Sequence, residues 1–221
     1  LRADYLRRVE RVIRACDQQG LVVILGLFYQ RQSKILHDEA AVRAGVVNAA
    51  RWIRTRGFTN VVVEVANEHP HRGYVHPVIR DPRGQAGLIR IARETAPGLL
   101  VTASGLGSGA LAPEVAEACD FLAPHWNGTK VEDIPARVAA LQPYGKPIVC
   151  NEDDKVGARA VAAMQASVAG GAAYGLMLKD HNQTLPFHFD GAADDPAYYA
   201  ALQAITGRSA AGATVTTARS A

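Results

Sequence analysis

Cysteine is scarce in this sequence, and its copies have no pattern typical of a metal site. Cys16, Cys119 and Cys150 lie far apart in the chain, and an odd number of thiols cannot all pair in disulfides. Metal sites built from cysteine need closely spaced pairs, which are absent here. The sequence therefore excludes a disulfide-rich scaffold and predicts that these cysteines are small buried hydrophobic side chains.

Long apolar runs and an excess of one charge are also missing. No stretch approaches the roughly 18 apolar residues of a membrane-spanning helix, and no leader pattern follows Leu1. The 24 basic and 21 acidic side chains give a formal charge of +3 and are scattered along the chain. The composition thus predicts neither a nucleic-acid nor a membrane partner. The cellular location stays open.

The length and the apolar content favour a single domain. The chain has 221 residues, of which 48% are hydrophobic, which is enough for one sizeable core and too little for two full domains. Residues 207–221 are mostly Ala, Ser, Thr and Gly and offer little to bury. We predict one catalytic domain over residues 1–206 and a disordered tail over residues 207–221.

Short apolar runs alternate with amphipathic segments along the whole chain. The runs predict strands at 21–28, 60–69, 99–103, 120–124, 146–150 and 172–178. The helical patterns lie at 4–19, 38–56, 85–95, 113–118, 131–141, 156–169 and 196–205. Strands that alternate with helices form parallel sheets. We therefore predict an α/β fold, a TIM (β/α)8-type barrel with six strand-helix units present and its first strands missing.

Polar side chains follow most of the predicted strands. In such barrels the active site is built at the carboxyl ends of the strands, so these side chains are expected to lie around one mouth. Among these strand ends are Asn67-Glu68, His125-Trp126 and Asn151-Glu152. The next two residues, Asp153 and Asp154, are predicted to cap the helix that follows.

The stretch from Asn60 to His69 is the most informative. Side chains alternate along a strand, so Glu64, Ala66 and Glu68 are predicted to share one face. A carboxylate buried in the middle of a strand is costly alone, so Glu64 needs a hydrogen-bonding partner inside the fold. The alternative is that Glu64 is held by an ordinary salt bridge in the core.

With both Asn-Glu pairs in view, the sequence resembles the clan A retaining glycoside hydrolases, a superfamily of cellulase-like (β/α)8 barrels. The segment Glu64-Val65-Ala66-Asn67-Glu68 is similar to the fourth-strand signature Glu-x-x-Asn-Glu. His125-Trp126 resembles the end of the sixth strand, and 146–149 leading to Glu152 resembles the seventh. Residues 169–178 resemble the approach to the eighth strand, although Met177, Lys179 and His181 stand where the family offers a Trp.

The resemblance implies hydrolysis of β-glycosidic bonds in a polysaccharide or oligosaccharide by double displacement. Glu68 would be the acid/base, held protonated, and Glu152 the nucleophile, kept ionised by hydrogen bonds. Such enzymes need their two carboxyl groups roughly 5 to 5.5 Å apart. The resemblance implies a carbohydrate partner and neither a cofactor nor a metal. The residues predicted to bind the substrate are Asn67, His125, Trp126 (by stacking on a sugar face), Tyr29 and His181.

Two other functions fit parts of the sequence. Histidines and carboxylates at strand ends are suitable ligands for a divalent metal, as in amidohydrolase-like barrels. The ligands in that case would be His69, His71, His125, Glu152, Asp154, Asp180 and His181. A non-catalytic carbohydrate-binding barrel is the second alternative, favoured by the missing strands and the altered eighth strand.

Overall fold

The computed structural model describes residues 2–179, 181, 183 and 186–210, with side chains described as far as residue 207. Its strands are β1 (Val23–Phe28), β2 (Val61–Ala66), β3 (Val101–Thr102), β4 (Ile148–Val149) and β5 (Ala172–Ala173). Its α-helices are α1 (Ala3–Gln18), α2 (Glu39–Arg56), α3 (Pro77–Arg80), α4 (Pro82–Thr95), α5 (Pro113–Ala118), α6 (Ile134–Leu141), α7 (Ala158–Ala169) and α8 (Pro196–Ala210). Short 3-10 turns lie at Ser33–Ile35, Val131–Asp133, Gln142–Tyr144 and Gly191–Ala193.

All paired strands are parallel. β1, β2 and β3 form one sheet in that order, and β4 and β5 form a second. The segment 121–125, close to the strand predicted at 120–124, joins the two sheets through isolated bridges. Leu122 pairs with Ile148 of β4, and Ala123 pairs with Ser104 just after β3. The parallel segments therefore follow one another in chain order, as the alternating sequence pattern predicts.

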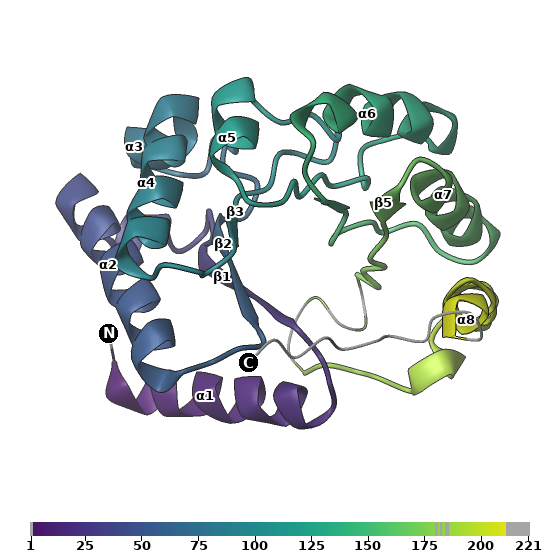
Figure 1. Ribbon diagram of the computed structural model, residues 1–221, viewed down its shortest axis with the longest axis horizontal. Coiled ribbons are helices and arrows are strands. Elements are labelled where there is room, and N and C mark those ends of the chain that lie inside the picture. The colour runs from purple at the N-terminus through teal and green to yellow at the C-terminus, as the bar shows by residue number, and fades with distance from the viewer. Residues whose placement is uncertain (1, 180, 182, 184–185, 211–221) are drawn as a thin grey trace, which may run out of the picture.

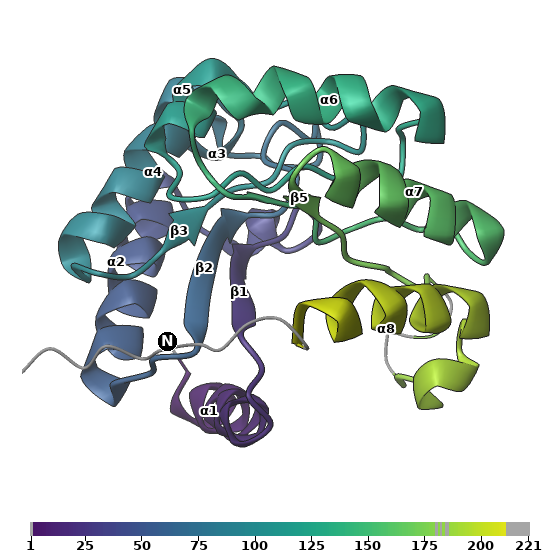
Figure 2. The same ribbon diagram turned by 45° about the vertical axis from the view of Figure 1, so that its right-hand side comes forward.

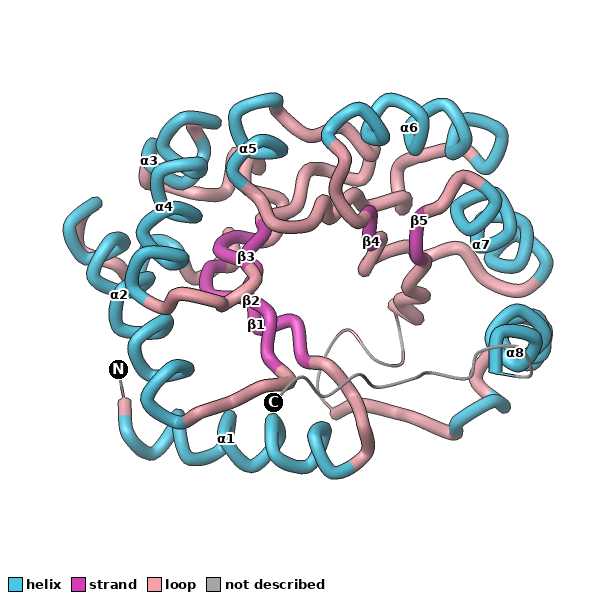
Figure 3. The backbone as a smooth tube through the Cα atoms, in the orientation of Figure 1, coloured by secondary structure: helices cyan, strands magenta, loops and turns pink. Residues whose placement is uncertain are grey.

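The helices lie outside the strands, which line the inner side of an arc (Figures 1 and 3). Helix α1 differs, because it lies across the amino-terminal ends of β1 and β2 (Figure 2). Asn60, just before β2, fixes it there by donating from Nδ2 to the carbonyl oxygens of Ile13 and Leu21, each at 3.1 Å. Within the described residues β1 and β5 do not pair with each other, so the strands form an open arc and no closed barrel.

Local sequence signals explain helix α2 and its packing. Asp38 caps its start by accepting a hydrogen bond from Ala41 N at 2.7 Å, and Gly57 ends it with a φ of 67°. Val42, Val46 and Ile53 recur at helical spacing and are buried. This face packs in the same core as Val61, Val63 and Val65 of β2.

Several predicted boundaries differ from the structure. The strand predicted at 172–178 is confined to β5 at Ala172–Ala173, and helix α8 extends to Ala210, beyond the predicted domain end at 206. Residues 207–210 therefore belong to a helix, and 211–221 lie outside the described residues. Cys119 and Cys150 are buried as predicted, whereas Cys16 is half-buried, and all three are free thiols. No described helix has both the length and the apolar character needed to cross a membrane.

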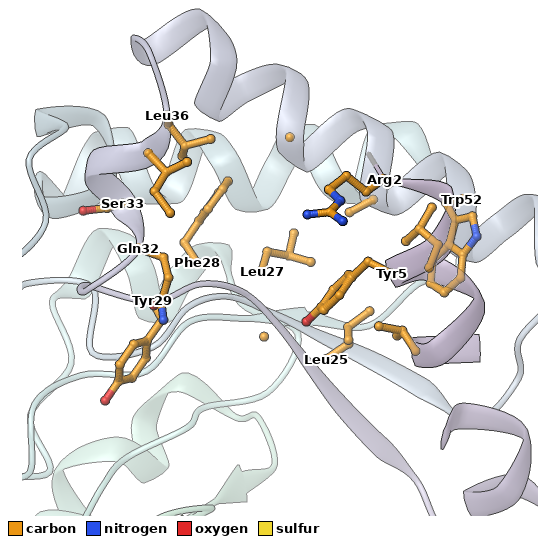
Figure 4. Close-up of a pocket in the computed structure, with 16 residues that line it drawn as sticks. Arg2, Tyr5, Leu25, Leu27, Phe28, Tyr29, Gln32, Ser33, Leu36 and Trp52 are labelled. Atoms are coloured by element: carbon orange, nitrogen blue, oxygen red, sulfur yellow. The ribbon is translucent and has the colours of Figure 1, made fainter. Parts of the chain in front are cut away.

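An apolar cavity of about 380 Å³ lies between α1, β1 and α2 (Figure 4). Leu25 and Leu27 of β1, Tyr5 of α1 and Trp52 of α2 contribute to its wall. At the carboxyl end of β1, the ring of Tyr29 points away from the apolar side chains of the cavity. The cavity lies between the strand and the helices. Tyr29 is part of its wall, whereas Glu68, His125 and Glu152, described below, do not line it.

Candidate active site

Three side chains from distant parts of the chain meet at the carboxyl ends of the strands. Glu68 follows β2, His125 ends the bridging segment 121–125, and Glu152 follows β4. Each offers one oxygen or nitrogen atom to a group whose members all lie within 4.8 Å of one another. His125 Nδ1 is 3.3 Å from Glu68 Oε1 and 3.6 Å from Glu152 Oε2. The imidazole of His125 therefore lies between the two carboxyl groups and contacts both through Nδ1.

The backbone at Glu68 departs from the predicted strand. β2 ends at Ala66, and Glu68 has a φ of 47°, in the left-handed region that costs a residue with a Cβ about 1–2 kcal/mol. Hydrogen bonds hold it there: Glu68 N donates to Ser104 Oγ at 2.7 Å, and His71 N donates to the Glu68 carbonyl at 2.8 Å. The predicted alternation through residue 68 is thus wrong, because the chain turns as it leaves the sheet. The turn aims the carboxyl group at His125.

His125 is fully buried, and its charge is governed by its neighbours. Burial alone lowers the pKa of an imidazole, but the hydrogen bond to Glu68 and the negative charges of Glu152 and Glu64 outweigh it. The pKa of His125 is raised above its ordinary 6.5 as a result. A proton on Nδ1 would lie between His125 and the two carboxyl groups. The other ring nitrogen, Nε2, has no hydrogen-bond partner among the described residues.

Glu152 is held by a residue that the sequence analysis did not assign to the site. Asn127 Nδ2 donates to Glu152 Oε1 at 2.8 Å. Burial raises the pKa of Glu152, although the charge of His125 and this hydrogen bond act in the opposite direction. The expected hydrogen bond is present and favours the ionised form of Glu152, but burial outweighs it, so the net change of the pKa is upward. Asn127 lies two residues after His125, and side chains two residues apart in an extended segment point to the same side. This alternation could have predicted Asn127 as a site residue.

A third carboxyl group, that of Glu64, lies in β2 behind this cluster. It is 5% exposed, and its Oε1 has no hydrogen-bond partner in the part of the chain that the structure describes. Burial raises the pKa of Glu64 above its ordinary 4.5, although the neighbouring Ser104 and the charge of His125 favour the ionised form. The predicted need for a partner is thus met only in part, and Glu64 joins the electrostatics of the site through His125.

Asn67 and Tyr29 lie beside one another at the same mouth. Phe28 pairs with Ala66 in the parallel register, so the next residues, Tyr29 and Asn67, leave the sheet together. The hydroxyl of Tyr74 donates to the carbonyl oxygens of both Phe28 and Asn67, at 2.9 and 2.7 Å, and joins the two strand ends. Tyr29 is 37% exposed, which leaves its ring accessible next to Asn67.

Trp126 does not have the predicted role. It is 0% exposed, its Nε1 donates to Ser167 Oγ at 3.3 Å, and its ring packs against Gly109. The prediction that Trp126 stacks on a sugar is wrong. Consecutive side chains of an extended segment point to opposite sides, so Trp126 points into the core when His125 points toward the two carboxyl groups. His181 Nδ1 lies 3.7 Å from Asp194 Oδ1, and the contact of His181 with substrate stays a prediction.

Asp153 also differs from expectation. Helix α7 begins only at Ala158, after Gly157, so the predicted cap by Asp153 is wrong. Its carboxylate is instead buried, with Lys155 Nζ donating to Oδ1 and Tyr174 OH donating to Oδ2, both at 2.9 Å. Lys155 Nζ also donates to the carbonyl of Trp126 at 2.7 Å. This buried ion pair ties the segment after Glu152 to the segment after His125.

The histidines of the metal alternative do not gather. Within the described residues, the group of metal-type ligand atoms that comes together is Glu68, His125 and Glu152. His69 is buried with neither ring nitrogen bonded in that part of the chain, and His71 Nδ1 accepts a hydrogen bond from Gly73 N at 2.9 Å. Asp180 lies outside the described residues. A cation at this mouth would therefore have to use both carboxyl groups of the candidate pair.

Comparisons with known proteins identify the fold. No protein-family model matches the sequence, and no curated protein is similar enough in sequence to match it. A solved endoglucanase has a TM-score of 0.61 and 12% sequence identity, over 92% of this chain and 78% of that one. A GH10 endoxylanase retrieved from a sugarcane soil metagenome has a TM-score of 0.64 and 11% identity, over 89% and 80%. At such identities the likeness shows the fold, and the chain has the α/β architecture of these glycoside hydrolase barrels.

Proposed function

We propose that this protein is a retaining glycoside hydrolase that cleaves β-glycosidic bonds in a polysaccharide or oligosaccharide. The observation that carries the proposal is the approach of Glu68 and Glu152, whose nearest oxygens lie within 4.8 Å across His125. Retaining enzymes hold their carboxyl groups about 5–5.5 Å apart, and inverting enzymes about 6.5–9.5 Å apart to admit a water. The spacing favours double displacement.

In this mechanism Glu152 attacks the anomeric carbon while Glu68 donates a proton to the leaving oxygen. The bond from the sugar to that oxygen breaks, and a covalent glycosyl ester forms on Glu152. Glu68 then accepts a proton from a water that attacks the ester, which releases the sugar with its original anomeric configuration. The positive charge of His125 and the Asn127 amide stabilise Glu152 as an anion before attack and as a leaving group afterwards. We expect Asn67 and Tyr29 to contact sugar hydroxyls.

The stereochemistry of the product tests the proposal most directly. Proton NMR of the first product from a β-linked substrate should show the β-anomer, and mutarotation should produce the α-anomer only later. Glu152→Ala should abolish turnover. Azide should restore it by attacking the anomeric carbon from the side that the Glu152 carboxylate occupied, and the product should be an α-glycosyl azide. Glu94→Gln, at an exposed position on α4, is the matched control and should leave turnover unchanged. An α-product as the first species would contradict the mechanism.

The role of Glu68 has its own test. Glu68→Gln keeps the size of the side chain and removes the transferable proton, and general acid catalysis contributes about 10²–10⁴-fold. We expect a loss of that order for substrates with a poor leaving group and a much smaller loss for an activated aryl glycoside. Equal losses of activity on both substrates would show that Glu68 is not the general acid.

The alternatives predict different results in the same experiments. A metal-dependent hydrolase built on the three-residue group would lose activity with a chelator and regain it with a divalent cation, and azide would not rescue Glu152→Ala. A non-catalytic carbohydrate-binding barrel, which the open arc of strands favours, would bind glycan equally well as Glu68→Gln or Glu152→Gln and would show no turnover in any form.

A further inference from the structure

A second cavity opens at the same mouth as the carboxyl pair. It has a volume of about 360 Å³ and lies between the loops that follow β1 and β2. We call it the rim pocket, and its polar wall consists of Tyr29, Gln30, Arg31, Lys34 and His71. The mechanism proposed above uses Tyr29 alone among these side chains.

The two loops are joined firmly enough to give the rim pocket a fixed shape. Ser33 Oγ donates to the Gln30 carbonyl at 3.0 Å, and Val75 N donates to the same hydroxyl at 3.4 Å. His76 Nε2 lies 3.2 Å from the carbonyl oxygens of both Ser33 and Leu36. The pocket is thus a preformed feature of the fold, as a binding subsite requires.

The rim pocket lies next to the reacting groups. Tyr29 leaves β1 opposite Asn67, one residue before Glu68. On the other loop, His71 N donates to the Glu68 carbonyl at 2.8 Å, and His71 itself lines the pocket. A polysaccharide with one sugar between the carboxyl groups would therefore place a neighbouring sugar or its side group at this pocket.

The charge of the rim pocket is opposite to that of the carboxyl cluster. Arg31 and Lys34 are exposed, and neither forms an ion pair with any described residue. His71 uses Nδ1 to accept from Gly73 N, which leaves Nε2 for a ligand. Gln30 adds a buried amide oxygen without a partner in that part of the chain. Two unpaired cations beside an accessible aromatic ring suit a ligand with an apolar sugar face and a carboxylate.

We propose that the rim pocket binds an acidic sugar, a uronic acid unit or side group, of the polysaccharide cut between Glu68 and Glu152. This inference rests on the proposed function and adds the chemical class of its substrate. The carboxylate of the sugar lies between Arg31 and Lys34, and the Tyr29 ring packs on the sugar face. The arginine supplies the bidentate donor geometry that carboxylates favour, and the lysine supplies a second positive charge.

Binding is tested in the Glu68→Gln background, so that no turnover is needed. Native affinity gels contain either an acidic polymer (glucuronoxylan or carboxymethylcellulose) or a neutral counterpart (carboxyl-reduced glucuronoxylan or hydroxyethylcellulose). We expect tighter binding to the acidic member of at least one pair. Arg31→Gln with Lys34→Gln should weaken that binding about tenfold, the value of one charge-assisted contact, and leave binding to neutral polymer unchanged. Salt at about 0.5 M should remove the preference.

The matched control is Arg51→Gln with Arg137→Gln, which removes the same charge from exposed positions on α2 and α6. An equal loss in this control would show that general charge attraction, and not the rim pocket, binds the polymer, and would overturn the inference. Equal affinity for both members of each pair would also overturn it. Neutral polymer hydrolysed with retention would in that case leave the proposed function intact. A specific preference without hydrolysis of any polymer would overturn the proposed function and leave the subsite in place.

Discussion

Glu64 offers a sharp test of the electrostatics beneath the site. Glu64→Gln keeps the shape of the side chain and removes its negative charge. The carboxyl group is 5% exposed, and its Oε1 has no partner among the described residues. A buried polar group left without a partner costs about 1–3 kcal/mol, and a charged one costs more. Gln also leaves a buried polar group unpartnered, so only the cost of the charge is removed. We therefore expect the variant to be more stable than the parent, wherever Glu64 is ionised in the folded protein, by about 1.4 kcal/mol for each tenfold increase in the proton affinity of Glu64 on folding.

The sign of the pH dependence follows from the raised pKa. Because Glu64 holds its proton more tightly in the folded than in the unfolded chain, ionising it destabilises the fold. The penalty is absent below the ordinary pKa of 4.5 and is fully present above the folded value. The stabilisation by Glu64→Gln should therefore be large at about pH 8 and small at about pH 4.

Urea unfolding of both proteins at several pH values measures the difference directly. Glu94→Gln, which removes a carboxyl group from the exposed face of α4, serves as the control and should show no such trend. Activity gives a second measurement: without the charge of Glu64 the pKa of His125 should fall, and any limb of the pH–rate profile that reports His125 should move to lower pH. A stability difference that does not change with pH, or a variant less stable at about pH 8, would refute the reasoning.

Two further predictions concern the support of the site. Lys155→Met leaves the buried carboxylate of Asp153 without its cation and should lower the free energy of unfolding, measured by urea titration, by about 3–5 kcal/mol. Adding Asp153→Asn should recover much of this loss. No recovery would argue against the ion pair. Gly109→Ala should cost about 2–4 kcal/mol, because the residue has a φ of 74° and a Cβ there would overlap the Trp126 ring. An unchanged melting temperature for Gly109→Ala would contradict this packing.

The order of helices and strands could be predicted because it depends on periodic burial. Val42, Val46 and Ile53 repeat at helical spacing and are all buried on one face of α2. The approach of Glu68 and Glu152 follows from a rule of parallel sheets, whose carboxyl ends share one edge. The order of the elements needs no particular side chain, which is why a single sequence was enough for it, whereas the approach of the two carboxyl groups also needs the turn at Glu68 that Ser104 holds.

Other features depend on contacts that no local pattern reports. Trp126 follows the polar end of a strand, where an aromatic ring can turn toward either the mouth or the core, and only the space beside Gly109 and Ser167 decides between them. Beside the Lys155–Asp153 pair, the hydroxyl of the half-buried Tyr174 donates to Asp153 Oδ2 from another segment. The left-handed backbone of Glu68 is held by a hydrogen bond from Glu68 N to Ser104 Oγ and by one from His71 N to the Glu68 carbonyl, and neither partner is its neighbour in the strand.

The isolated bridges around segment 121–125 have a consequence for how such sites diverge. His69 N donates to the Ser104 carbonyl at 3.1 Å, Ser104 is bridged to Ala123, and Trp126 N donates to the Glu152 carbonyl at 2.9 Å. Peptide groups, common to every residue, thus set the spacing of the two acids. Side chains along this path other than Ser104, Asp153 and Lys155 can therefore change without moving the two acids apart. The loops that leave these strands can vary while the two acids keep their positions.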